Sequence, residues 1–121
     1  MTDDDTPLAK LRDRVHAFCT ERDWDRFHGP RDLAIGVVTE AAELLEIFRF
    51  RSEAEAADLL KDEQGRKRVE QELADVLFFV LRMADRHGID LTSAFLQKLA
   101  ANAERYPVEK SRGSNKKYDE P

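Results

Sequence analysis

The stretch KRVEQELADVLFFVLRMADRH, residues 67–87, decides the fold of this chain. Its apolar residues recur every three to four positions, which is the spacing of one face of an α-helix; they include Val69, Val76, Phe79 and Met83. Gly88 directly follows and is a typical helix stop. The stretch therefore predicts a long amphipathic helix with one face in a core.

Similar spacing predicts further helices before and after this one. We expect helices over 7–22 and 33–50, a short helix opened by a capping box of Ser52 with Glu55, and a last helix from Asp90 or Thr92 through Arg105. The segments 23–30 and 62–66 are expected to be loops, as is the chain from Pro107 onward. No segment has the pattern of a strand, so the fold class is all-α.

Length and charge limit the organisation and the partners. The 121 residues fit one domain, which we divide into a disordered acidic N-terminus (1–6), a helical domain (7–106) and a basic C-terminal tail (107–121). The net charge of −5 argues against nucleic acid as a partner. No run is apolar enough for a membrane span, there is no signal peptide, and Cys19 is alone, so we expect a cytoplasmic protein without disulfides.

Two pairs of acidic residues occur inside the apolar helices. They are Glu40-x-x-Glu43 and Glu72-x-x-Asp75, each spaced by about one helical turn. Glu40 and Glu72 fall on the arcs expected to face the core, and Glu43 and Asp75 lie at the edges of those arcs. A buried carboxylate without a partner is costly, so the two pairs predict a shared cationic ligand.

The residue types select the metal. A site made only of carboxylate oxygens, without His or Cys, suits Mg²⁺ or Mn²⁺ better than zinc or copper. Carboxylates around a Mg²⁺ ion that keeps several waters commonly hold the phosphates of a substrate. The alternative is that such pairs, frequent in a chain with 37% charged residues, lie on solvated helix faces.

Lys98, Asn102 and Arg105 form a polar row on the last predicted helix. At i, i+4 and i+7 they lie within about 60° of one another, on the arc of Leu91 and Phe95, and so face inward. Their donors suit terminal phosphates. The alternative is that the two cations pair with surplus acidic residues.

With these residues placed, the chain resembles the MazG-like all-α nucleoside triphosphate pyrophosphohydrolases, and among them the dCTP pyrophosphatase branch. The resemblance runs from about Leu8 to Tyr118. It is carried by the two acid pairs, by the segment ERDWDRFHGPR (21–31), by Lys98-x-x-x-Asn102-x-x-Arg105-Tyr106-Pro107, and by Ser111-Arg112-Gly113-Ser114 with Lys117-Tyr118.

The resemblance implies a four-helix bundle, a homotetramer built as a dimer of dimers, and Mg²⁺-dependent hydrolysis of a nucleoside triphosphate to the monophosphate and pyrophosphate. Glu40, Glu43, Glu72 and Asp75 would be the catalytic metal ligands. The substrate would be contacted by Trp24, Phe27, His28, Phe50, Phe79, Lys98, Asn102, Arg105, Tyr106 and Arg112. Phe50 stands where the branch has a Trp, and Phe79 where it has a Tyr.

In such a reaction, water activated by metal attacks the α-phosphorus in line with the departing pyrophosphate. We expect Glu40 to be the carboxylate nearest that water, because its apolar surroundings raise its proton affinity. Three alternatives stay open: the same reaction on dUTP, the same reaction on damaged or many different nucleotides, and a non-catalytic helical adaptor that binds a structural cation.

Overall fold

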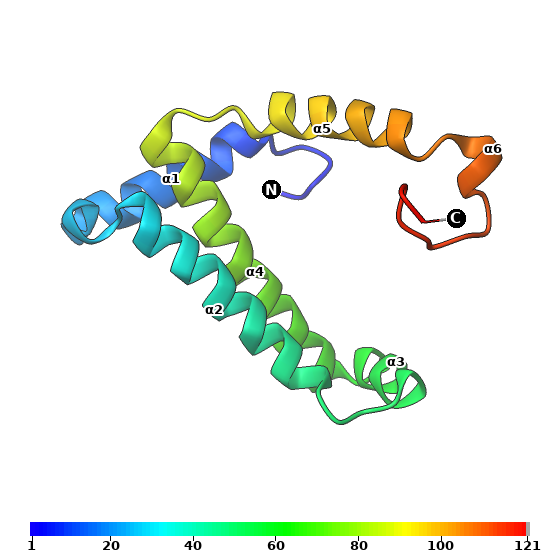
Figure 1. Ribbon diagram of the computed structural model, residues 1–121. Coiled ribbons are helices and arrows are strands. Elements are labelled where there is room, and N and C mark those ends of the chain that lie inside the picture. The colour runs from blue at the N-terminus through cyan, green and yellow to red at the C-terminus, as the bar shows by residue number, and fades with distance from the viewer. Residues whose placement is uncertain (121) are drawn as a thin grey trace. The chain divides into compact units, whose positions relative to one another are not determined.

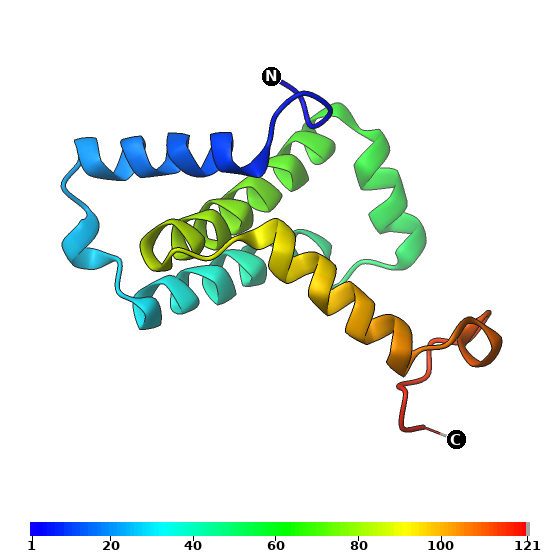
Figure 2. The same cartoon turned by 90° about the horizontal axis from the view of Figure 1, so that it is seen from above.

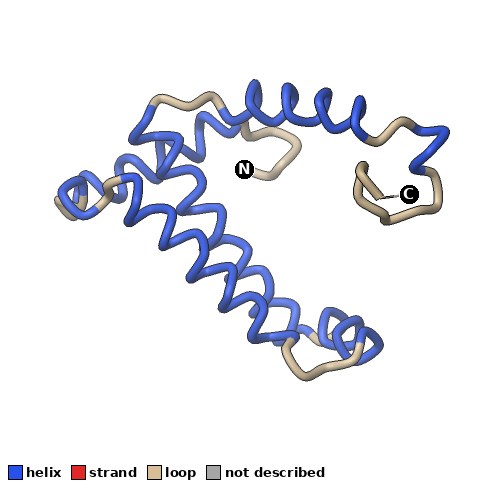
Figure 3. The backbone as a smooth tube through the Cα atoms, viewed as in Figure 1, coloured by secondary structure: helices blue, strands red, loops and turns tan. Residues whose placement is uncertain are grey.

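The computed structural model describes residues 1–120 and contains no strand within them (Figure 3), so the all-α class is confirmed. Six α-helices and one 3₁₀ turn make up the described chain. They are α1 (Leu8–Glu21), η1 (Asp25–Phe27), α2 (Pro30–Phe48), α3 (Glu53–Lys61), α4 (Glu63–His87), α5 (Leu91–Arg105) and α6 (Val108–Ser111). None of the helices in this part of the chain is long and apolar enough to cross a membrane.

Two compact units divide the chain after Gly88, and each is described by itself. In the first unit α4 is the central helix, because α1, α2 and α3 each pack against it. Helices α2 and α4 lie side by side along most of their length in both views (Figures 1 and 2). The second unit contains α5 and the short α6. The predicted division at residues 6 and 106 stays a prediction.

The core of the first unit is small. Its buried apolar side chains come from α1, α2 and α4; they are Val15, Cys19, Leu33, Ile47, Val69, Leu81 and Ala84. On α4 only Val69 belongs to the predicted core face, because Val76, Phe79 and Met83 are half-buried. Many large apolar side chains remain exposed, among them Val38 and Leu45 on α2 and Leu73 on α4. The chain therefore leaves more apolar surface uncovered than is usual for a monomer.

Most helix ends agree with the local signals. Ser52 and Glu55 form the predicted capping box in both directions, and Gly88 ends α4 in the left-handed conformation at φ 63°. Such a φ favours glycine, because it has no Cβ to clash with the backbone. Residues 22–29, between α1 and α2, carry Trp24, Phe27 and His28 and are here called the aromatic loop. This loop contains the 3₁₀ turn η1.

Three predicted loops were wrong in part. Helix α2 begins at Pro30, the last residue of the predicted loop 23–30, and ends at Phe48, before the predicted end at Phe50. The segment 62–66 is the start of α4, because the side chain of Asp62 accepts a hydrogen bond from the Gly65 backbone N–H at 2.9 Å and caps the helix. Residues Val108–Ser111 form the helical turn α6, which begins directly after Pro107. At the other end of the chain, residues 2–5 form a turn in which Asp5 and Thr2 exchange hydrogen bonds.

Candidate metal and nucleotide site

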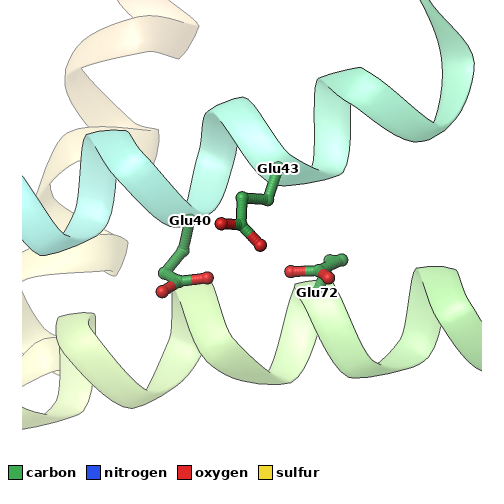
Figure 4. Close-up of side chains that lie close together, drawn as sticks. All are labelled: Glu40, Glu43 and Glu72. Carbon is green, nitrogen blue, oxygen red and sulfur yellow. The ribbon is translucent and has the colours of Figure 1, made fainter.

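Three carboxylates converge between α2 and α4. Glu40 and Glu43 project from α2, and Glu72 projects from α4 toward them (Figure 4). One oxygen from each carboxylate lies within 4.8 Å of the other two. The spacing i, i+3 places both α2 residues on the side that faces α4, so the predicted convergence of the acid pairs is seen for these three residues.

This cluster of Glu40, Glu43 and Glu72, here the acid cluster, has no internal compensation. No ion pair within residues 1–120 involves any of the three. Oε2 of Glu72 is enclosed and has no hydrogen-bond partner. Burial raises the pKa of Glu40 above its usual value, and the neighbouring charges of Glu43, Asp75 and Glu72 add to the effect.

These features fit a hard divalent cation. An enclosed carboxylate oxygen without a partner is costly, and a cation bound between the three residues would satisfy it. The donor set is all oxygen, as Mg²⁺ and Mn²⁺ prefer. Glu40, Glu43 and Glu72 are therefore the residues that could hold the ion.

Asp75 is exposed and lies outside the group of three. The charge of Asp75 nevertheless contributes to the raised pKa of Glu40, so Asp75 lies close enough to interact electrostatically with the acid cluster. As a metal ligand, Asp75 stays a prediction.

The Phe79 ring of α4 lies against Gly36 of α2, one helical turn before Glu40. A Cβ atom at Gly36 would lie 2.5 Å from the Phe79 ring, so the absence of a side chain at Gly36 allows the ring to pack directly on α2. Phe79 also meets Phe78 edge to face at 5.4 Å. Its observed contacts are thus with Gly36 on α2 and with Phe78 on its own helix, and its predicted contact with substrate stays a prediction.

Only some of the aromatic side chains predicted to bind the substrate lie close together. The Trp24 ring meets Phe18 at 5.6 Å and His28 at 6.0 Å, both edge to face. Phe27 is 58% exposed and Phe50 is 91% exposed. Phe50 also adopts φ 67°, which is unusual for a bulky residue and is often found at functional positions. The structure therefore brings Trp24 and His28 together and leaves Phe27 and Phe50 in solvent.

A buried arginine on α4 anchors this loop. Arg82 donates hydrogen bonds to His28, Asp25 and Asp85, and Arg86 adds an ion pair with Asp25 at 3.5 Å. The hydrogen bond from Arg82 is the main cause of the lowered pKa of Asp25. Sequence reasoning missed this cluster of Arg82, Asp25, Asp85 and His28, here the Arg82 cluster; the only local signal was the i, i+3 pair of Arg82 with Asp85.

The second unit holds the predicted phosphate row. On α5, Asn102 is half-buried, whereas Lys98 and Arg105 are exposed, so the expectation that all three face inward was wrong for this chain alone. The reason is that α5 has only the four-residue α6 beside it in its own unit.

Part of the C-terminal segment folds back on the end of α5. The Arg105 guanidinium lies 5.1 Å from the Tyr118 ring centroid, and Tyr106 meets Tyr118 edge to face at 6.0 Å. Arg105 and Tyr106 line a pocket there together with Lys110, Lys116 and Lys117. Arg112 is exposed and does not line it.

Comparison with known proteins places these features in a family. The model of the MazG-like family matches residues 35–120, which include the acid cluster and the polar row. The chain is 42% identical to dCTP pyrophosphatase 1 of Rattus norvegicus over 116 residues, covering 93% of this chain and 68% of that protein. It is 39% identical to dCTP pyrophosphatase 1 of Homo sapiens over 118 residues, covering 95% and 69%.

A solved structure agrees with the sequence matches. The crystal structure of a pyrophosphatase from Archaeoglobus fulgidus superposes with a TM-score of 0.76 at 37% identity, covering 83% of this chain and 92% of that one. Both the helical arrangement and the residues thus lead to the same assignment, and the chain belongs to the MazG-like family.

Proposed function

We propose that this protein is a Mg²⁺-dependent nucleoside triphosphate pyrophosphohydrolase that converts dCTP to dCMP and pyrophosphate. The observation that carries the proposal is the acid cluster: three carboxylates from two helices, without a cationic partner, in a chain whose relatives are dCTP pyrophosphatases. A cluster of this charge repels a triphosphate unless a cation lies between them.

Glu40, Glu43 and Glu72 would hold the ion, with Asp75 as the fourth acid. When bound, a divalent cation offsets the charge of the triphosphate and makes water a stronger acid. The pKa of Glu40 is raised, and this carboxylate is the proposed proton acceptor for the attacking water. Hydrolysis at the α-phosphorus would then release pyrophosphate.

Lys98, Asn102 and Arg105 are proposed to hold the phosphates. Their amide and cationic donors match terminal phosphate oxygens, and Lys98 and Arg105 are exposed. Tyr106 and Arg112 are proposed as further substrate contacts beside them.

Trp24 and His28 are proposed to contact the nucleoside, with Phe27, Phe50 and Phe79 as additional aromatic surface. Stacking on an aromatic ring contributes roughly 1–3 kcal/mol per base. Trp24→Ala should therefore raise KM by about one to two orders of magnitude and change kcat less. Steady-state kinetics with dCTP would measure this split, and an unchanged KM would remove Trp24 from the nucleoside site.

We also propose that the protein is a cytoplasmic homotetramer. In the second unit Phe95, Leu96 and Leu99 on α5 are exposed, and in the first unit Val38, Leu45 and Leu73 are exposed on α2 and α4. Exposed apolar surface of this kind is what association covers. Light scattering would decide the oligomeric state. A fully active monomer of 14.0 kDa would contradict the tetramer.

The function is tested by a panel of canonical and modified nucleoside triphosphates with Mg²⁺, in which pyrophosphate and phosphate release are measured separately. We expect pyrophosphate from dCTP or a 5-substituted dCTP, slower reaction with dATP and dGTP, and no reaction in EDTA. Including dUTP separates the cytosine preference from a general pyrimidine preference. Release of phosphate alone, or no turnover of any substrate, would refute the proposed reaction.

A further inference from the structure

Arg82 is the only fully buried charged residue in residues 1–120, and its guanidinium contacts three different side chains. Nε donates to Nδ1 of His28 at 2.8 Å, and Nη1 donates to Asp85 at 2.6 Å. Nη2 donates to Asp25, which lies in the same loop as His28. The planar fork thus attaches that loop to α4 at two points.

The bond to His28 determines where the imidazole proton lies. Arginine nitrogens only donate hydrogen bonds, so Nδ1 of His28 must accept and cannot carry a proton. A neutral imidazole carries one N–H, which is therefore at Nε2. We infer that Arg82 is a positioning residue that holds His28 neutral with the proton at Nε2, so that His28 presents one N–H donor to an acceptor atom of the nucleobase.

That donor is available to a ligand. Within residues 1–120 no hydrogen bond engages Nε2 of His28, and the one enclosed side-chain polar atom without a partner is Oε2 of Glu72. Nε2 therefore reaches solvent. The ring it belongs to lies edge to face with Trp24, at 6.0 Å and 71°, so donor and aromatic surface are held together.

The electrostatic surroundings agree with a neutral ring. Burial lowers the pKa of His28 below its usual value, and the positive charges of Arg82 and Arg86 lower it further. Asp25 and Asp32 act in the opposite direction without reversing the shift. The imidazole thus stays neutral near pH 7 and cannot act as a second cation for phosphate.

This inference rests on the proposed function, because it names the part of the nucleotide that His28 would bind. Cytosine offers two acceptors at N3 and O2, whereas N3 of uracil carries a proton and is a donor. A fixed N–H at Nε2 directed at N3 favours cytosine, while a mobile tautomer would accept either base. Arg82 would then contribute to base selection without touching the substrate itself.

The first test needs no nucleotide. Long-range ¹H–¹⁵N NMR spectra of protein labelled at histidine report which ring nitrogen carries the proton, with exposed His87 as the internal reference. We expect His28 to show a proton at Nε2 and none at Nδ1 near pH 7. A proton at Nδ1, or a doubly protonated ring, would overturn the inference.

The second test compares Arg82→Lys with Arg86→Lys. Both residues lie on α4 and both pair with Asp25, but only Arg82 bonds to His28. We expect Arg82→Lys to mix the tautomers of His28, to raise KM for dCTP several-fold and to narrow the preference for dCTP over dUTP, with kcat nearly unchanged. Arg86→Lys should change none of these.

Equal changes in KM for the two variants would show that Arg82 acts only through general stability. If Arg82→Lys does not fold, the NMR measurement of the His28 tautomer in the wild-type protein decides whether the inference holds. Wild-type protein that hydrolyses no nucleoside triphosphate contradicts the proposed function, and the tautomer alone then decides whether Arg82 positions His28.

Discussion

Helix α4 takes part in two clusters of charge that are organised in opposite ways. In the Arg82 cluster a fully buried cation meets two carboxylates and a histidine, and each guanidinium nitrogen has a partner. In the acid cluster three carboxylates face one another, one enclosed oxygen has no partner, and burial and repulsion raise the pKa of Glu40.

The difference separates structural from functional charge. A compensated buried ion pair holds elements together, and its removal costs stability. An uncompensated cluster of like charge costs stability in the free protein, and is retained where a ligand supplies the missing charge. In this chain, the first kind anchors the aromatic loop and the second kind forms the candidate metal site.

Removing a carboxylate from the acid cluster should have the largest effect on activity. Glu43→Ala, Glu72→Ala and Asp75→Ala are each expected to lower turnover of dCTP by at least about 100-fold, as for the loss of other transition-state electrostatic groups. Helical content measured by circular dichroism should stay near that of wild type. The matched control is Glu46→Ala, because Glu46 lies on α2 but pairs with Arg49 at 3.0 Å. A fully active Glu43 or Asp75 variant would contradict the metal assignment.

Removing the cation from the Arg82 cluster should mainly reduce stability. Arg82→Met leaves Asp25 and Asp85 without their main partner and is expected to lower the free energy of unfolding by about 3–5 kcal/mol. Arg86→Met removes a half-exposed arginine from the same Asp25 and should cost less than about 1 kcal/mol. Urea titrations of both variants would measure the contrast, and equal losses would argue against it.

Neutralising Glu40 should raise the stability of the metal-free protein, whereas removing Arg82 should lower it. Glu40 has a raised pKa in the folded state, so its contribution to stability is present below its usual pKa of 4.5 and is lost as pH rises through the folded value. Metal-free Glu40→Gln should therefore melt a few degrees higher than wild type at pH 7. Differential scanning calorimetry in EDTA would detect the shift. A lower Tm would mean that the carboxylates do not repel one another in the folded protein.

The smallest expected effect concerns pH and His28. Its pKa is lowered on folding, so its contribution to stability is present above its usual value of 6.5 and is lost as pH falls through the folded pKa. Wild type should thus lose stability as the pH falls below 6.5, with a slope of at most about 1.4 kcal/mol per pH unit. His28→Gln should flatten this slope. Urea unfolding across the range would test it, and identical slopes would exclude His28 as the cause.

The sequence predicted the elements better than their partners. The positions of α1 and α2 to within three residues, the course of α4 from residue 67 to its stop at Gly88, and the capping box at Ser52 depend on nearby residues, and they were confirmed. The start of α4 was missed because the polar residues after Asp62 resemble a loop until the cap is recognised. Glu40 and Glu72 were found because an acid on an apolar face is conspicuous in sequence.

The Arg82 cluster could not be found in this way. Arg82 pairs with Asp25, 57 positions earlier, and an arginine within an amphipathic helix is ordinarily read as surface. The predicted inward orientation of Lys98 and Arg105 was wrong for another reason. The arc of α5 was expected to face a core, but its own unit contains no large helix to cover it.

The most direct test of the central claim is a titration of Mn²⁺ into the nucleotide-free protein, followed by electron paramagnetic resonance of the free ion. Mn²⁺ accepts the same oxygen ligands as Mg²⁺. We predict binding to wild type and to the Glu46→Gln control, and loss of that binding in Glu72→Gln. Equal binding by wild type and Glu72→Gln, or none by wild type, would contradict the assignment of the acid cluster as the metal site.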